Sequence, residues 1–146
     1  VKLVFISSYL SEDDGITNMN YYDVVLANDL CVFPSYYEPW GYTPLEASAF
    51  KIPCITTDLS GFGQWVDATL KHQGMIEDGV EVLHRNDDNY FDVAQKICNT
   101  TMKVLNASKT VRNEMRKNAA ALADKAQWSN FIKYYYQAYD FALRKK

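Results

Sequence analysis

The chain has 146 residues, 48% of them apolar, and a formal net charge of −3 at pH 7. That length fits one domain with a substantial core, the charge gives no indication of a nucleic-acid partner, and no apolar run approaches the ~20 residues of a membrane-spanning helix. No signal peptide is visible, and the first residue, Val1, leads us to expect that the native N-terminus is absent. Three scattered cysteines predict neither a disulfide framework nor a zinc site, so the expected location is cytoplasmic.

The first part of the chain predicts a strand, a helix and a second strand. Val1–Ser7 is a short run rich in β-forming residues. The polar Ser11–Gly15 that follows is typical of a solvated turn. Asn20–Asp29 has the spacing of an amphipathic helix, and Leu30–Pro34 is a second strand that proline terminates.

The alternation continues through the rest of the chain. Thr43–Lys51 is a predicted helix, Ile52–Asp58 a third strand and Gly79–Arg85 a fourth, with a glycine-bearing segment between them that opens a helix near Phe62. From Asn89 onward the periodicity is helical, and the expected helices are Tyr90–Leu105, Ser108–Ala126 and Trp128–Leu143.

This order of elements predicts an α/β fold, with a parallel Rossmann-like sheet and a helical C-terminal extension, in which residues 1–146 form a single domain. In such sheets the loops that follow the strands lie at the carboxyl edge, where ligands bind. The loops Ser35–Tyr42 and Leu59–Gly63 each follow a predicted strand. We therefore expect both loops at a ligand-binding edge.

The stretch FPSYYEPWGYTPLEASAF, residues 33–50, supports two interpretations. Thr43 as the N-cap, Pro44 at the first helical position and Glu46 at the third would form a capping box, with Glu46 serving only the helix. Alternatively, Gly41 lets a ligand approach the backbone, and the free amides and dipole of the helix start favour a phosphate. Glu46 can then accept hydrogen bonds from a ribose diol, while Glu38 faces whatever lies beyond the phosphates.

The longer stretch FPSYYEPWGYTPLEASAFKIPCITTDLSGFG resembles the signature of the glycogen synthases of the animal and fungal type, which are retaining GT-B glycosyltransferases. Glu38 and Glu46 match the two glutamates of that signature, with seven residues between them. The match runs nearly unbroken from Val32 to Gly63, and a weaker one begins at Val1 and continues to about Tyr136. The resemblance implies transfer of glucose from UDP-glucose, in preference to ADP-glucose, to the non-reducing end of an α-1,4-glucan with retention.

The resemblance also implies a role for each matching residue. Glu38 is the expected catalytic residue, contacting the donor glucose and stabilising the oxocarbenium-like transition state. Protein cations and helix amides neutralise the leaving diphosphate in this family, so no metal or cofactor is expected. The remaining implied contacts are the backbones of Trp40 and Gly41 with the sugar, Tyr42 and Thr43 with the pyrophosphate, Glu46 with the ribose and Tyr21 stacked on uracil.

Each of these residues has a structural interpretation as well. On pattern alone, a tyrosine placed like Tyr21 is more often a core residue than a nucleotide platform. Trp40 is compatible with a packing role, and Gly61 and Gly63 with simple turns. Two other classes of function stay open: another retaining GT-B transferase with the same carboxylate pair, and a non-catalytic binding or assembly module.

The chain is also too short for both domains of a GT-B enzyme. We expect part of the C-terminal, nucleotide-sugar-binding domain without the N-terminal acceptor domain, inactive when isolated, and a homo-oligomer is possible. The family's arginine-rich helix that receives glucose 6-phosphate matches KTVRNEMRKNAAALADKAQW here, residues 109–128. Lys109, Arg112, Arg116 and Lys117 remain in it, but AAALA stands where more charge is expected, so we interpret this stretch as an ordinary solvated helix face.

Overall fold

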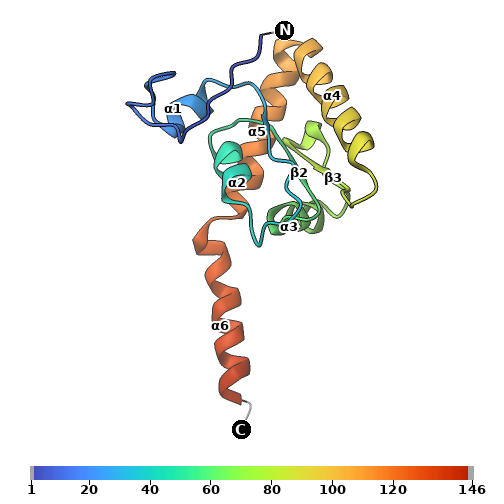
Figure 1. Cartoon of the computed structure of the whole chain (residues 1–146). Helices are drawn as coiled ribbons and strands as arrows, with labels where there is room; N and C mark the ends of the chain where they lie inside the picture. The colour runs from blue at the N-terminus through green and yellow to red at the C-terminus, as the bar shows by residue number, and fades with distance from the viewer. Residues whose placement is uncertain (1, 145–146) are drawn as a thin grey trace.

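A three-stranded parallel sheet forms the centre of the computed structural model, which describes residues 2–144 (Figure 1). The strands β1 (Cys31–Val32), β2 (Cys54–Thr57) and β3 (Val80–Leu83) lie in the order β1-β2-β3. The predicted α/β class and parallel sheet are therefore confirmed. The helices are α1 (Tyr21–Leu26), α2 (Tyr42–Ala49), α3 (Gly61–Leu70), the 3-10 helix η1 (Ile76–Asp78), α4 (Tyr90–Asn106), α5 (Lys109–Lys125) and α6 (Trp128–Arg144).

Helices cover both faces of the sheet. On one face, Cys54 and Val82 of the strands pack with Phe62 of α3 and Leu122 of α5 in the larger core cluster. On the other face, side chains of β2 and β3 pack against Val93 of α4. All four residues of β2 are buried, as expected for the central strand of a sheet that is covered on both sides.

Short polar side chains begin several helices where the sequence predicts. Asn20 accepts a hydrogen bond from the amide of Asp23 in α1, and Ser60 accepts one from Gly63 in α3. The helix predicted at residues 90–105 ends one residue later, at Asn106. These local signals position the elements because side-chain capping satisfies amides that have no partner inside the helix.

The predicted N-terminal strand is wrong. Lys2–Ser7 contain no strand, and Val1 lies outside the described residues. Leu3, Val4 and Phe5 are 91%, 72% and 80% exposed. The run has β-forming composition, but no other segment among residues 2–144 pairs with it, and a strand requires a neighbouring ladder to satisfy its backbone groups.

The predicted capping box is also wrong. Helix α2 begins at Tyr42, and its N-cap is Gly41, which has φ +115° and supplies no side-chain hydrogen bond. Thr43 therefore lies inside the first turn, and Glu46 lies too far along the helix to bond back to an N-cap. The backbone enters the helix in a conformation that glycine adopts readily and other residues do not, so the helix starts earlier than the Thr-Pro pattern indicates.

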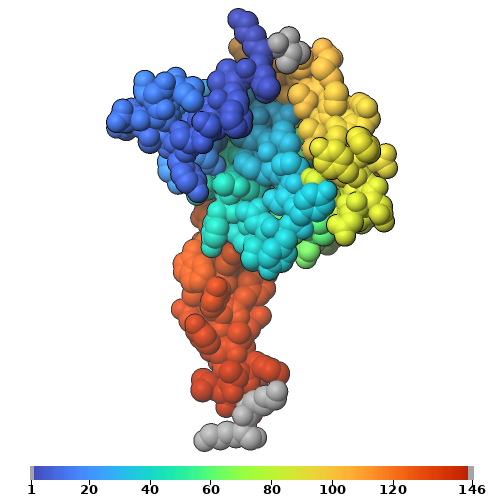
Figure 2. Space-filling view, in the orientation of Figure 1, coloured from blue at the N-terminus to red at the C-terminus, as the bar shows by residue number. Residues whose placement is uncertain are grey.

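The C-terminal helix α6 extends away from the sheet and its covering helices (Figures 1 and 2). None of its described residues is buried. Helices α4, α5 and α6 together confirm the predicted helical extension. Within residues 2–144, no helix is both long enough and apolar enough to cross a lipid bilayer.

Candidate functional site

The loops after β1 and β2 meet at the carboxyl edge of the sheet. The amide of Glu38 donates to the carbonyl of Leu59 at 3.2 Å, and the amide of Gly61 donates to the carbonyl of Glu38 at 3.0 Å. The amide of Phe62 also donates to the carbonyl of Trp40 at 2.6 Å. This short parallel pairing holds the Glu38 loop, residues 33–41, directly against the start of α3.

Gly61 and Gly63 make this close approach possible. A Cβ atom on Gly61 would lie 2.2 Å from the carbonyl oxygen of Pro39, and one on Gly63 would lie 2.2 Å from that of Thr57. Both distances are far below any ordinary contact. The two glycines therefore serve backbone packing between β2, α3 and the Glu38 loop, which is a more specific role than forming a turn.

The carboxylate of Glu38 lies beside the N-terminus of α2. The hydroxyl of Ser35 donates to its Oε2 at 3.2 Å. The same oxygen is 3.4 Å from the position that a Cβ atom on Gly41 would occupy. Glu38 is half-buried, so its carboxylate is held in place without being removed from the surface where a ligand could reach it.

The first turn of α2 supplies free backbone donors next to that carboxylate. The amides of Tyr42 and Thr43 have no acceptor within the helix, and Gly41 contributes no capping side chain. Tyr42 is exposed and Thr43 half-buried. Amides in this position, together with the helix dipole, favour an anion, and the predicted pyrophosphate contacts of Tyr42 and Thr43 fall here.

Glu46 lies one turn further along α2, close to the two tyrosines of α1. The hydroxyl of Tyr22 donates to Oε1 of Glu46 at 3.4 Å, and the Tyr22 side chain is 48% exposed. The ring of Tyr21 packs against the larger core cluster. Its hydroxyl is buried and has no hydrogen-bond partner among residues 2–144. Burial raises the pKa of the Tyr21 phenol, and the nearby Glu46 carboxylate raises it further.

The stacking role predicted for Tyr21 stays a prediction. Tyr22 was not among the predicted site residues, although its ring is the more accessible of the two and lies beside Glu46. The helical spacing does separate the two tyrosines, because Tyr21 shares a face with Val24 and Val25. That face packs on the core, with Val25 buried and Tyr21 against the larger cluster. The spacing could not indicate that Tyr22 lies beside Glu46, a residue of another helix.

Trp40 has a packing role through its side chain. Its ring lies 6.0 Å from that of Phe62, 6.0 Å from that of Trp65 and 5.5 Å from that of Phe131, measured between centroids. Its carbonyl already accepts the Phe62 amide. The indole therefore fixes the Glu38 loop to α3 and α6, and the main-chain amide is the group of Trp40 that could face a sugar.

One hollow on the described part of the chain lies beside this site, and neither glutamate lines it. It has a volume of about 410 Å³ and is lined by Trp40, Tyr42 and Leu45 on one side and by Trp128, Phe131 and Tyr135 on the other. We place the candidate site at Glu38, Gly41 and Glu46 on chemical grounds, because the hollow is walled almost entirely by apolar rings. Among residues 2–144, no group of three or more His, Cys, Asp or Glu side chains is placed to hold a metal ion.

Two further residues at this edge were missed by the sequence analysis. Arg85, which follows β3, is only 6% exposed, and its guanidinium donates to the carbonyl of Pro34 in the Glu38 loop at 2.7 Å. Thr57, the last residue of β2, donates through its hydroxyl to the carbonyl of Ser35 at 2.7 Å. Both contacts join segments that are far apart in sequence, so no local pattern could have indicated them.

Parallel strands, a helix N-terminus and two carboxylates at the carboxyl edge together define an α/β domain of the class that binds ligands at that edge. Comparison with known proteins narrows the class. The sequence model of the family described as Glycogen synthase matches residues 1–146, the whole chain. The chain belongs to the glycogen synthase family.

Several characterised relatives agree with this assignment. The glycogen (starch) synthase of Neurospora crassa is 32% identical over 145 residues, covering 99% of this chain and 20% of that protein. Isoform 2 of the Saccharomyces cerevisiae enzyme is 29% identical, with 99% and 21% coverage. The liver enzyme of Mus musculus is 31% identical, with 99% and 20% coverage. This chain thus spans about a fifth of the length of these relatives.

Proposed function

We propose that this chain forms the donor-binding part of a glycogen synthase, a glycosyltransferase that moves glucose from UDP-glucose to the non-reducing end of an α-1,4-glucan. Both the glucosyl bond of UDP-glucose and the new glucan bond are α, so the reaction proceeds with retention. The proposed architecture is GT-B, and the proposed location is the cytoplasm.

One observation carries the proposal. The carboxylate of Glu38 and the free amides of Tyr42 and Thr43 lie together at the N-terminus of α2, with Oε2 of Glu38 3.4 Å from the Cβ position of Gly41. A sugar diphosphate requires an anion site and a sugar site in immediate succession. The placement of these groups side by side supports such a pair of sites, in a chain of the glycogen synthase family.

The proposed roles follow the order of groups in the donor. Glu38 stabilises the positive charge that develops on the glucosyl ring, acting in the transition state more than in the bound ground state. The backbone of Trp40 and Gly41 contacts the sugar, and the first-turn amides of α2 contact the diphosphate. Glu46 accepts hydrogen bonds from the ribose hydroxyls, and a tyrosine of α1 stacks on the uracil. For this last role Tyr21 is the predicted residue and the exposure of Tyr22 favours it as the alternative.

The chain spans about a fifth of its relatives, so the proposal assigns it only part of the reaction. The glucan acceptor would be bound by a separate N-terminal domain, and the isolated chain is expected to be inactive. Assembly as a homo-oligomer is compatible with this arrangement.

The test uses the complete polypeptide that carries this chain. Transfer of labelled glucose to glycogen is measured with UDP-glucose and with ADP-glucose, and Glu38→Ala is compared with Glu12→Ala, an exposed glutamate in the Ser11–Gly15 turn. We expect a kcat/KM ratio that favours UDP-glucose, and a kcat lowered about 100-fold or more by Glu38→Ala alone.

Three results would contradict parts of the proposal. A kcat/KM ratio favouring ADP-glucose would overturn the choice of nucleotide. Near-normal turnover of Glu38→Ala would remove Glu38 from the mechanism. Binding of UDP without any transfer by the unsubstituted polypeptide would instead identify a non-catalytic binding module.

A further inference from the structure

Arg85 is a buried cation whose contacts reach the Glu38 loop. It follows β3, is 6% exposed, and donates from Nη1 to the carbonyl of Pro34 at 2.7 Å. Its guanidinium carbon also lies 3.7 Å from the ring centroid of Tyr36. One side chain just after β3 therefore contacts two residues of the loop that follows β1, Pro34 and Tyr36, at the carboxyl edge of the sheet.

Burial of the Arg85 guanidinium in this way is unfavourable for the stability of the fold. Arg85 makes no ion pair with any carboxylate among residues 2–144, and its Nε is buried without a hydrogen-bond partner. Burying a charge without a paired counter-charge is unfavourable, and an apolar side chain of similar volume is often the more stabilising choice. The guanidinium provides a directional hydrogen bond to the loop backbone, which an apolar side chain cannot form.

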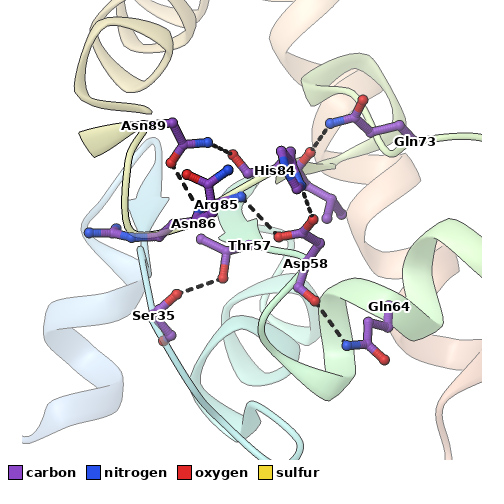
Figure 3. Close-up of polar contacts among 10 residues, drawn as sticks. Ser35, Thr57, Asp58, Gln64, Gln73, His84, Arg85, Asn86 and Asn89 are labelled. Carbon is purple, nitrogen blue, oxygen red and sulfur yellow. Dashed lines mark hydrogen bonds and ion pairs between the residues drawn. The ribbon is translucent and has the colours of Figure 1, made fainter. Parts of the chain in front are cut away.

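The backbone of Arg85 is itself fixed to β2. Its amide donates to Oδ1 of Asp58 at 3.0 Å, and Nδ1 of His84 lies 2.5 Å from Oδ2 of the same carboxylate. The amide of Asp58 in turn donates to the carbonyl of Leu83 at 3.0 Å. Figure 3 shows the Asp58 carboxylate joined by dashed lines to both of the neighbouring residues His84 and Arg85. Arg85 is therefore attached through its backbone to the residue that follows β2 and through its guanidinium to the Glu38 loop.

Thr57 supports the same loop from the end of β2. Its buried hydroxyl donates to the carbonyl of Ser35 at 2.7 Å (Figure 3). The hydroxyl of Ser35 then donates to Oε2 of Glu38 at 3.2 Å. Arg85 thus holds the carbonyl of Pro34, and Thr57 holds the carbonyl of the next residue, Ser35. Ser35 in turn donates directly to the Glu38 carboxylate.

We propose that Arg85 and Thr57 are positioning residues, which set the location of the Glu38 carboxylate by fixing the carbonyls of Pro34 and Ser35. This inference rests on the proposed function of Glu38. Neither residue contacts the donor; each acts through the loop. Its loss should therefore affect turnover more than donor binding, because the diphosphate and ribose sites on α2 stay in place.

The first test compares Arg85→Met and Thr57→Val with Arg116→Met in the complete polypeptide. Arg116 is a matched control, because it also donates to backbone carbonyls, those of Asn28 and Lys51, and pairs with Asp29. Asn28 and Asp29 precede β1 and Lys51 precedes β2, so the contacts of Arg116 lie at the opposite edge of the sheet from those of Arg85. We expect Arg85→Met and Thr57→Val to lower kcat at least about 10-fold with the KM for UDP-glucose changed less than about 3-fold. Arg116→Met should leave both within about 2-fold.

A double substitution separates positioning from general damage. Once the carboxylate of Glu38 is gone, a residue that acts through it has nothing left to position. Arg85→Met combined with Glu38→Ala should therefore be no slower than Glu38→Ala alone. Additive losses, or equal effects of Arg85→Met and Arg116→Met on kcat, would overturn the proposal. Arg85→Lys keeps the charge but not the planar fork, so it should recover only part of the turnover.

Amide hydrogen exchange gives a readout that does not depend on catalysis. The amides of residues 35–38 should exchange about 10-fold faster in Arg85→Met, and at an unchanged rate in Arg116→Met. If the unsubstituted polypeptide transfers no glucose, the proposed function fails, while faster exchange still supports the anchoring of the loop. Unchanged exchange in both Arg85→Met and Thr57→Val would refute the positioning role even in an active enzyme.

Discussion

Gly61→Ala offers a direct test of whether the contact between the Glu38 loop and α3 matters for function. Gly61 is the first residue of α3, where alanine would ordinarily improve helix propensity by up to about 1 kcal/mol. Here the added Cβ would lie 2.2 Å from the carbonyl oxygen of Pro39, with Cα of Trp40 also close at 3.2 Å. The neighbours on the loop are backbone atoms, so they cannot rotate away.

The expected magnitude follows from that distance. An ordinary contact begins near 3.4 Å, so the loop must retreat by about 1 Å, which stretches the hydrogen bonds that join Glu38 to Leu59 and to Gly61. Overpacking of this kind costs about 1–3 kcal/mol, which exceeds the gain in helix propensity. A displacement of about 1 Å at a catalytic group costs on the order of 100-fold in rate.

Two measurements check the reasoning. Urea unfolding of the chain should show Gly61→Ala to be less stable by about 1–2 kcal/mol, and the complete polypeptide should lose kcat about 100-fold with a smaller change in the KM for UDP-glucose. Gly15→Ala is the control: its φ is +74° with no atom within 4 Å of the new Cβ, so it has backbone strain alone and should leave turnover intact. Turnover of Gly61→Ala within about 3-fold of the unsubstituted enzyme would refute the link between this contact and the placement of Glu38.

Glu46, the tyrosine pair and Glu81 each permit a test by single substitution. Because Glu46 does not cap its helix, Glu46→Gln should change the unfolding free energy by less than about 0.5 kcal/mol while raising the KM for UDP-glucose; a large loss of stability with unchanged KM would contradict its ribose role. Removing the buried hydroxyl in Tyr21→Phe, which has no hydrogen-bond partner among residues 2–144, should leave stability equal or higher by up to about 1 kcal/mol. Stacking is tested by removing each ring: Tyr22→Ala should weaken UDP binding measured by calorimetry more than Tyr21→Ala does, and the reverse ranking would favour Tyr21 as the stacking residue. Burial raises the pKa of the Glu81 carboxyl above its ordinary 4.5. The folded state therefore binds this proton more tightly than the unfolded state does. Its contribution to stability is present below pH 4.5 and is lost as the pH rises from 4.5 through the raised pKa of the folded state. Thr100→Val removes the hydroxyl bonds at 2.9 and 2.8 Å that support the ionised form, so its cost should be about 1–2 kcal/mol at pH 7 and less at pH 4; equal costs at the two pH values would refute this account.

The order of elements could be predicted from the sequence because each element carries local signals. Apolar periodicity places the helices, and runs of β-forming residues place the three observed strands, within a few residues. The strand predicted at Val1–Ser7 is wrong because a strand depends on more than local composition. Its composition is that of a strand, but a strand also requires a partner, and composition contains no information about which segments lie side by side.

The residues of the candidate site divide in the same way. Glu38, Gly41 and Glu46 lie within one stretch of sequence, so a motif can indicate them together. Arg85 and Thr57 reach the same loop from other strands and only become visible in three dimensions. The start of α2 is an intermediate case, since Thr-Pro is a strong local signal that the left-handed conformation of Gly41 overrides.

The anchors around Glu38 act on its backbone and leave most of its carboxylate free. Leu59 and Gly61 bond to the main chain of Glu38, while Arg85 and Thr57 bond to the two residues at the start of its loop. Within residues 2–144, the hydroxyl of Ser35 is the only donor to the carboxylate, and it uses Oε2. A group that must stabilise charge in a transition state has to be fixed in position yet keep an oxygen available for the substrate. Holding the loop through its carbonyls and amides satisfies both requirements, which is why we expect changes at Gly61, Arg85 and Thr57 to lower turnover without removing any atom that would touch the donor.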